Sequence, residues 1–276
     1  MSSHSLFHTS RRVALGCALV CLTSGAFAQN VVRITGTGSG TGGMRLLAQA
    51  FMQANPTVRV DVLPALGSSG GISALVAGQI ELAVSNRPPK PAEIDKLAML
   101  SVEYARTPFV VAVHKDLGVG ALTSAQLAAL FAEGAATFPN GKRARPVLRI
   151  SDTGDTTLLK SFGPAVSTAI DAAMQRRGML NADTDSEAAD LVERTSGAFA
   201  GSTLALIESE KRPLVGVAID GKAPTVAALL DGSYPYFKPL YMVIGAQAGA
   251  ETKRFAAYLQ SAAGRAMLRA HGHAPL

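Results

Sequence analysis

Short apolar runs alternate along the chain with stretches whose apolar residues recur at helical spacing. Strands are predicted at residues 31–34, 58–63, 81–84, 147–150, 214–219 and 238–245. Helices are predicted at residues 44–54, 72–77, 91–97, 125–131, 165–177, 186–196, 251–259 and 262–269, and a long extended segment at 101–114. This alternation predicts an α/β fold built on a sheet.

Three of the predicted strands end in segments rich in glycine and hydroxyl residues, and each segment precedes a predicted helix. These segments are residues 35–43, 67–71 and 151–157. The start of a helix leaves backbone N–H groups unpaired and carries partial positive charge, so such a turn is suited to holding an anion. An ordinary capped junction or a flexible glycine-rich turn is the alternative for any one of them. Together they indicate one shared small-molecule site.

The first 28 residues have the layout of a secretory signal peptide. Arg11 and Arg12 precede an apolar core at 13–22, and Ala26 and Ala28 form a small-x-small cleavage site, so we expect a mature chain from Gln29 and a periplasmic location. Both cysteines of the chain lie in this segment, in a context that does not favour lipid attachment. The remaining chain therefore has no disulfide, thiol nucleophile or cysteine metal site.

The charge pattern narrows the kind of partner. The chain has 26 Lys and Arg against 20 Asp and Glu, a net charge of +6 that falls to +4 without Arg11 and Arg12. This mild excess favours anionic ligands. There is no basic cluster with interleaved aromatic residues, so we expect no nucleic acid partner, and no later apolar run is long enough to span a bilayer.

Seven landmarks, taken in order, resemble the periplasmic phosphate-binding proteins of ABC importers. They cover essentially the whole mature chain. They are a Gly/Thr/Ser-rich loop before a helix ending in Asn55-Pro56, the Gly-Ser-Ser-Gly-Gly-Ile run at 67–72, Ala83 to Pro88, Leu122 to Leu127, Arg149 four residues before Thr153-Gly154, Tyr234-Pro235 ahead of Lys238 to Tyr241, and the end at His271 to Leu276.

The resemblance implies a two-lobed periplasmic binding protein of type II-like architecture, with the ligand in a cleft between lobes joined by a two-segment hinge. Lobe one would comprise 29–112 and 221–276, and lobe two 113–220. The family also implies an inner-membrane ABC permease as partner. We further expect a monomer that uses no cofactor or metal.

The ligand site implied by the family brings the three glycine-rich segments together. Arg149 matches a charged clamp whose guanidinium fits two oxyanion oxygens, although a structural ion pair with Asp152 or Asp155 is its alternative. Ser68 matches a hydroxyl donor, with helix capping as its alternative. The expected ligand-binding residues are Ser39, Gly40, Thr41, Gly42, Ser68, Ser69, Gly70, Asn86, Arg149, Thr153, Gly154, Asp155 and Thr156.

Two positions depart from the family pattern. Asn86 stands where the family usually has an Asp that accepts the proton of bound hydrogen phosphate, so the charge-based rejection of fully ionised anions is lost. Asp155 stands where the family usually has Thr, which places a carboxylate near the expected anion. Both departures concern the identity of the ligand, whereas the fold expectation is unaffected by them.

The leading functional hypothesis is a non-enzymatic binding protein that captures an oxyanion, phosphate first, for an ABC importer. The alternative within the same fold is a binder of another small ligand, for transport or for sensing. A secreted phosphatase is the third hypothesis. It is disfavoured because the mature chain lacks cysteine, a His/Asp cluster with metal-ligand spacing and a Gly-x-Ser-x-Gly nucleophile elbow.

Overall fold

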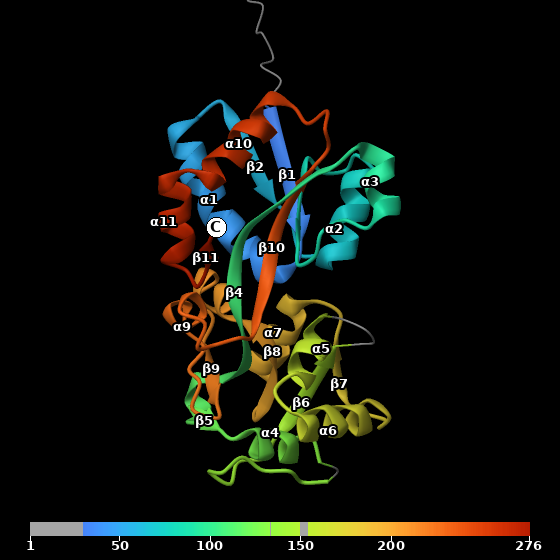
Figure 1. The fold of residues 1–276 in the computed structure, drawn as a ribbon, viewed down its shortest axis with the longest axis vertical. Helices are drawn as coiled ribbons and strands as arrows, with labels where there is room; N and C mark the ends of the chain where they lie inside the picture. Colours follow the sequence, from blue (N-terminus) through green and yellow to red (C-terminus); the bar gives the residue numbers. More distant parts are fainter. Residues whose placement is uncertain (1–29, 133, 150–153) are drawn as a thin grey trace, which may run out of the picture.

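The computed structural model describes residues 30–132, 134–149 and 154–276, and it has two α/β lobes stacked along the long axis (Figure 1). The expected signal peptide, residues 1–28, lies outside the described residues. Within the described ranges no helix combines the length and the apolar character needed to cross a lipid bilayer.

The sheet of the upper lobe has the strand order β2-β1-β3-β10-β4. β1 pairs in parallel with β2 and β3, and β10 runs antiparallel between β3 and β4. The strands are β1 (Asn30–Gly36), β2 (Val58–Val62), β3 (Leu82–Ser85), β4 (Leu100–His114) and β10 (Phe237–Ile244). Because β1 and β3 are parallel, their carboxyl ends meet at one edge of the sheet, which faces the other lobe.

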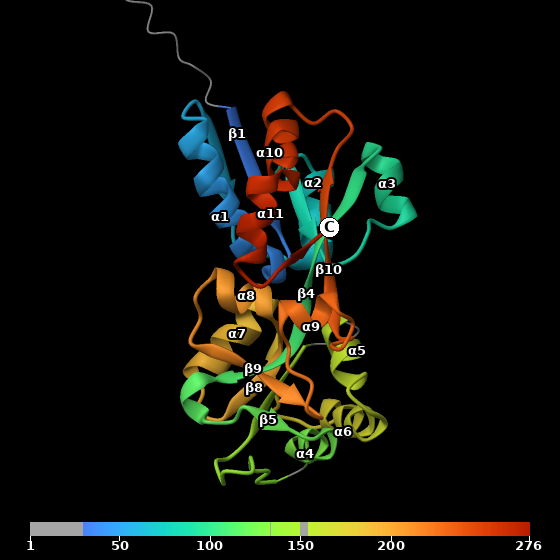
Figure 2. The same ribbon diagram turned by 60° about the vertical axis from the view of Figure 1, so that its left-hand side comes forward.

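Helices cover both faces of this sheet, as Figures 1 and 2 show from two directions. They are α1 (Gly38–Ala54), α2 (Gly67–Val76), α3 (Pro91–Leu97), α10 (Ala250–Gln260) and α11 (Ala262–Arg269). On one face Met44 and Phe51 of α1 pack with Phe255 of α10 in a buried cluster. On the other face Ile72 of α2 packs against Val243 of β10. The alternation of apolar positions read from the sequence corresponds to these two faces.

The lower lobe continues the same sheet through the second half of β4. Residues 109–113 pair with β8, and residues 111–114 with β9, both antiparallel. β6 lies parallel to both β8 and β7. Its strands are β5 (Ala121–Leu122), β6 (Arg145–Arg149), β7 (Leu180–Ala182), β8 (Ala198–Thr203) and β9 (Leu214–Ile219).

Aromatic residues pack together in the core of the lower lobe. Phe199 lies edge-on to Phe131 and Phe138, with ring centroids 5.2 and 5.7 Å away. Such edge-to-face pairs add to the burial of the rings themselves. The surrounding helices are α4 (Ser124–Leu130), α5 (Gly154–Lys160), α6 (Pro164–Met174), α7 (Asp185–Arg194) and α8 (Leu204–Ser209).

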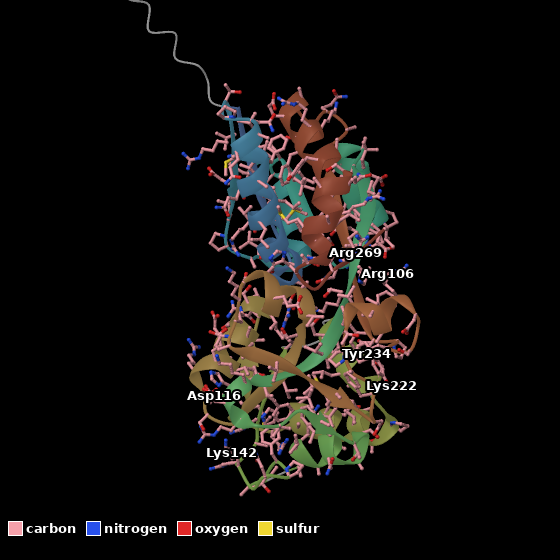
Figure 3. All side chains as sticks on the ribbon, turned by 90° about the vertical axis from the view of Figure 1, so that its left-hand side faces the viewer. Arg106, Asp116, Lys142, Lys222, Tyr234 and Arg269 are labelled. Atoms are coloured by element: carbon pink, nitrogen blue, oxygen red, sulfur yellow. The ribbon has the colours of Figure 1, made fainter. Side chains whose placement is uncertain are left out.

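β4 and β10 connect the lobes. β4 changes partner between Pro108, which pairs with β10, and Phe109, which pairs with β8. From the lower lobe the chain passes through α9 (Val226–Leu230) and returns to the upper lobe along β10. Between α9 and β10, the hydroxyl of Tyr234 donates to the carbonyl of Phe109 at 2.5 Å. Figure 3 labels Tyr234 and Arg106 near the level where the lobes meet. The lobe boundaries expected at residues 112 and 220 remain a proposal.

Two of the glycine-rich segments differ from the sequence prediction. Residues 38–43 and 67–71 were expected as loops, but they form the first turns of α1 and α2. The glycines of α1 are used for close packing: a Cβ at Gly38 would lie 2.6 Å from Ser186 Oγ, and one at Gly42 would lie 2.1 Å from Ser209 Oγ. β7, β8 and α8 were not predicted.

Candidate functional site

A cleft of about 600 Å3 lies between the lobes, at the carboxyl ends of β1, β3 and β6. It takes residues from both lobes and from β10, so closure of the lobes would alter every part of it. It is lined by Thr37, Leu66, Gly67, Ser68, Ser69, Asn86, Arg87, Arg149, Gly154, Asp155, Thr157, Leu158, Asp183, Asp185, Phe237, Lys238 and Pro239.

The carboxylate of Asp185 is the meeting point of the donors in this cleft. Its Oδ2 accepts from the backbone N–H of Ser39 at 3.0 Å and from the Ser39 hydroxyl at 2.6 Å. The hydroxyl of Thr37 lies 2.8 Å from the same oxygen. Its Oδ1 accepts from Lys238 Nζ at 2.9 Å and from Arg149 Nη1. Asp185 is only 3% exposed, so these contacts replace water almost completely.

Asp185 thereby caps a helix that belongs to the other lobe. Thr37 is the N-cap residue of α1, but its side chain makes no capping hydrogen bond, whereas Asp185 accepts from the N–H of Ser39 in the first turn. A carboxylate at a helix N-terminus satisfies free N–H groups and complements the helix dipole. The first turn of α1 is therefore an anion-binding site that holds a carboxylate.

Arg149 and Lys238 each contact two carboxylates. Arg149 Nη1 lies 2.9 Å from Asp155 Oδ2 and also contacts Asp185, while its Nη2 donates to the carbonyl of Asp183 at 2.9 Å. Lys238 Nζ contacts Asp155 as well as Asp185. Two cations and two carboxylates thus form a buried cluster with no net formal charge. The Arg149–Asp155 ion pair, left open as an alternative by the sequence, is present.

The pKa values of the two carboxyl groups are shifted in opposite directions. Burial and the neighbouring Asp185 charge raise the pKa of Asp155 to about 6, against the opposing effect of Lys238 and Arg149. Burial also acts to raise the pKa of Asp185, but Lys238, Arg149 and the Ser39 hydroxyl together lower it well below its usual range. At neutral pH both carboxylates are therefore ionised, and a proton added near pH 6 goes to Asp155.

Asn86 is fixed by hydrogen bonds at the upper wall of the cleft. Its Oδ1 lies 2.5 Å from the Thr37 hydroxyl, its Nδ2 donates to the carbonyl of Pro239 at 3.2 Å, and its backbone N–H donates to Ser68 Oγ at 2.9 Å. The single hydrogen of Thr37 Oγ1 goes either to Asn86 or to Asp185. An ionised aspartate at position 86 could not donate to the carbonyl of Pro239, so this hydrogen bond favours asparagine at the position.

The outer part of the cleft carries a second arginine. Arg87 Nη2 donates to Ser69 Oγ at 3.1 Å, and the guanidinium pairs with Glu93 at 2.8 and 2.9 Å. The hydrogen bonds from Arg87 lower the pKa of Glu93 to about 2. Arg87 is therefore neutralised by its own partner. The capping role considered for Ser68 is not seen, since its hydroxyl accepts from Asn86.

Several of the expected site residues lie away from the cleft lining. Gly40 packs against Val84 and Tyr104, and the hydroxyl of the buried Thr41 is 3.4 Å from the carbonyl of Gly38. The same holds for Gly42, which faces Ser209, for Gly70, which packs against Leu66, and for Thr156, whose hydroxyl is 3.4 Å from the Arg149 carbonyl. The predicted ligand contact of Thr153 falls outside the described residues. Ser39 does not line the cleft, but its hydroxyl donates to Asp185, which does.

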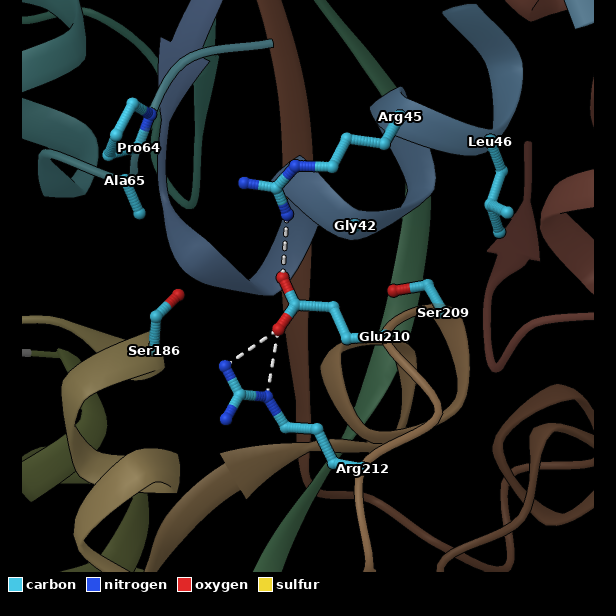
Figure 4. Close-up of a pocket in the computed structure, with 9 residues that line it drawn as sticks. All are labelled: Gly42, Arg45, Leu46, Pro64, Ala65, Ser186, Ser209, Glu210 and Arg212. Carbon is cyan, nitrogen blue, oxygen red and sulfur yellow. Dashed lines mark hydrogen bonds and ion pairs between the residues drawn. The ribbon is translucent and has the colours of Figure 1, made fainter. Parts of the chain in front are cut away.

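Gly42 lies in a second inter-lobe groove of about 510 Å3, shown in Figure 4. Glu210 joins Arg45 of α1 to Arg212 there, at 2.8 and 2.7 Å. Arg212 pairs in addition with Asp190 and Glu193. Because the charged groups of this groove are already paired with one another, it presents no concentrated positive charge to a ligand.

The sequence analysis assigned no role to Asp185 and Lys238 of the cluster, nor to Thr37, whose hydroxyl lies against Asp185. Thr37 lay within a recognised segment, and Lys238 lay in one of the landmarks, but neither was assigned a role. Asp185 gave no usable signal, because an acidic residue after a capping Thr184 is typical of any helix start. Within the described residues no group of three His, Cys, Asp or Glu side chains could hold a metal ion.

Comparison with known proteins is consistent with this architecture. Residues 23–263 match the family model for the PBP superfamily domain. Protein SphX of Synechococcus elongatus is 25% identical, over 83% of this chain and 73% of that protein.

Two solved structures share the fold. A Clostridium perfringens protein assigned as a phosphate ABC transporter substrate-binding protein, solved with bound phosphate, superposes with a TM-score of 0.70 at 22% identity, over 90% of this chain and 100% of that one. An ABC-type phosphate transport receptor from Vibrio cholerae gives a TM-score of 0.55 at 19% identity, over 89% and 99%. The prediction of a two-lobed α/β fold is confirmed.

Proposed function

The chain belongs to the PBP superfamily, and from this and the cleft we propose that it is a periplasmic solute-binding protein that captures an oxyanion, phosphate first, for an inner-membrane ABC importer. The structural relatives described above are a substrate-binding protein and a transport receptor, which supports a binding role over an enzymatic one. The periplasmic location rests on the expected signal peptide.

The observation that carries the proposal is the convergence of donors on the carboxylate of Asp185. A guanidinium, an ammonium, hydroxyl groups and a helix N-terminus together hold a pair of negatively charged oxygens. Phosphate and related oxyanions present oxygens to which the same donors bind, and charge-assisted hydrogen bonds of this kind are the strong ones. The cleft therefore contains an oxyanion receptor built from both lobes.

The two carboxylates of the cluster favour a second candidate within the same fold. Asp155 and Asp185 neutralise Arg149 and Lys238, so the cleft lacks the net positive charge that a free dianion prefers. The apolar side chains of Leu66, Leu158 and Phe237 also line it. A small organic ligand, in which one anionic group is joined to an apolar or cationic part, would match both features.

Calorimetric titration of the purified protein tests the proposal directly. Phosphate, sulfate, an organic phosphate monoester and an amino acid form the panel, and we expect saturable binding of at least one oxyanion. Replacing Arg149 with Gln removes the charged fork and should weaken that binding by a few kcal/mol, about 100-fold or more.

Arg45→Gln is the matched control, because Arg45 belongs to the second groove and not to the cleft. Its affinity for the oxyanion should stay within about threefold of the unsubstituted protein. If no oxyanion binds, or if both arginine variants lose affinity equally, the proposed oxyanion function is wrong. Binding of the amino acid alone would favour the second candidate.

A further inference from the structure

We propose that Asp185 is a built-in competitor of the ligand: its carboxylate takes the donors that a bound oxyanion would use, and so sets the affinity of the cleft. This inference rests on the proposed function, since it concerns the same cleft. It assigns to Asp185 the role of a specificity-determining residue, acting on the binding of any fully ionised anion.

The first argument is geometric. The carboxylate receives the backbone N–H and the hydroxyl of Ser39 on one oxygen, and Lys238 and Arg149 on the other. These donors come from lobe one, from β10 and from lobe two, which is the combination that a ligand clamped between lobes would engage. An oxyanion in the cleft can reach this set of donors only by taking some of them from Asp185.

The second argument is that α7 does not need Asp185 for its own start. The N-cap residue of α7 is Thr184, whose hydroxyl accepts from the N–H of Glu187 at 3.1 Å. The Asp185 side chain is therefore available, and it turns away from its own helix to the first turn of α1, 146 residues earlier in the chain. In this position the Asp185 residue is only 3% exposed.

The third argument is electrostatic. If an oxyanion entered while Asp185 remained in place, three negative groups would face the two cations Arg149 and Lys238, because Asp155 already contacts both. Like charges brought together in a buried site repel one another strongly, because little water is present to screen them. Removing the charge of Asp185 should therefore strengthen the binding of an anion that carries no proton of its own.

The test compares Asp185→Asn with Asp190→Asn in calorimetric titrations with sulfate and with phosphate. Asp190 is an exposed residue of the same helix, it lies outside the cleft lining, and it pairs with Arg212 of the second groove. The two variants thus remove the same charge from one helix, inside and outside the cleft. We expect Asp185→Asn to bind sulfate about 10- to 100-fold more tightly than the unsubstituted protein, and Asp190→Asn to change affinity by less than about threefold.

A second measurement covers the case in which Asp185→Asn folds poorly. Asp185→Ala leaves the donors facing a space the size of a carboxylate group, so acetate should bind there and raise the thermal midpoint of unfolding by several degrees. Chloride at the same ionic strength should not have this effect. Asp190→Ala should show no acetate-specific rise, and neither should the unsubstituted protein.

The outcomes separate this inference from the proposed function. Unchanged or weaker sulfate and phosphate binding in Asp185→Asn, with binding intact in the unsubstituted protein, would overturn the inference and leave the function standing. Equal strengthening in both Asn variants would do the same, as would the absence of acetate rescue. If neither anion binds to any of the proteins, the proposed function fails and the inference fails with it.

Discussion

Single residues decide the chemistry of this cleft, and the most informative are the four charged ones. Arg149, Lys238, Asp155 and Asp185 are almost fully removed from water, yet each cation contacts both carboxylates. A buried ion pair contributes little to stability compared with apolar packing, because desolvation offsets much of the attraction. The cluster is thus better explained by its position in the cleft than by the stability of the fold.

The raised pKa of Asp155 leads to a prediction about stability and pH. The folded protein holds a proton on this group, with a pKa of about 6, more tightly than the unfolded chain does at about 4. The folded state therefore binds more protons between these values, and the contribution of Asp155 to the free energy of unfolding falls as the pH rises through that window. The loss is at most about 3 kcal/mol at neutral pH.

Urea denaturation between pH 4 and pH 7 measures the free energy of unfolding of the unsubstituted protein and of the Asp155→Asn variant. Their difference isolates Asp155 from other groups, such as the buried His273, whose pKa is lowered to about 4 by burial and whose contribution changes in the opposite direction. We expect the advantage of the unsubstituted protein to decrease as the pH rises. A difference that is constant with pH would show that Asp155 does not hold the proton.

At the scale of elements, the contact between α1 and α7 joins the lobes. The two helices meet at their N-terminal ends, where Asp185 caps α1 and Gly38 lies against Ser186. The sequence predicted α1 from residue 44 onward because four glycines in six residues disfavour a helix. Packing against lobe two overrides this preference, because α1 can approach α7 this closely only if position 38 has no side chain. Local propensity contains no information about that neighbour.

The close approach predicts that Gly38→Ala destabilises the protein. The added Cβ would lie 2.9 Å from the backbone N of Ser186 and 3.0 Å from Asp185 Cβ, so the two helices must move apart. We expect a loss of about 1–3 kcal/mol in the free energy of unfolding. Since the chain contains no tryptophan, circular dichroism in a denaturant titration is the appropriate measurement.

Gly154→Ala provides the matched control. Gly154 is likewise the first residue of its helix, α5, but among the described residues a Cβ there meets no atom within 4 Å. The substitution should leave stability unchanged or raise it by up to about 1 kcal/mol, the ordinary preference of a helix for alanine. Equal effects of the two substitutions would mean that the α1–α7 contact is not tightly packed.

For the whole molecule, the sequence was sufficient for the two-lobed α/β class and for most strands and helices. It also identified Arg149, Asp155, Asn86 and Ser68, all of which line the cleft. It could not identify the partner that Arg149 and Lys238 share, because Asp185 lies 36 residues from Arg149 and 53 residues from Lys238 along the chain. Long-range contacts of this kind leave no periodic or local pattern in the chain.

The same contact predicts how the lobes move. Asp185 of lobe two holds Ser39 of lobe one, so it restrains the lobes when no ligand is bound. Its replacement by Asn removes the charge that attracts Lys238 and Arg149, and the inter-lobe distance should become more variable. An added oxyanion that takes the same donors should restrict it again.

Spin labels on α3 and α6 can measure this distance by electron–electron double resonance. Lys96→Cys and Ala165→Cys are exposed positions, one in each lobe, and the native Cys17 and Cys21 are replaced by Ala. We expect a narrow distance distribution in the Asp185 protein, a broader one in Asp185→Asn, and narrowing of the latter on addition of phosphate. A pair within lobe one, Lys96→Cys with Gln53→Cys, should give the same distribution in all three states. An equally narrow inter-lobe distribution in anion-free Asp185→Asn would show that other contacts, such as Glu210 with Arg45, hold the lobes together.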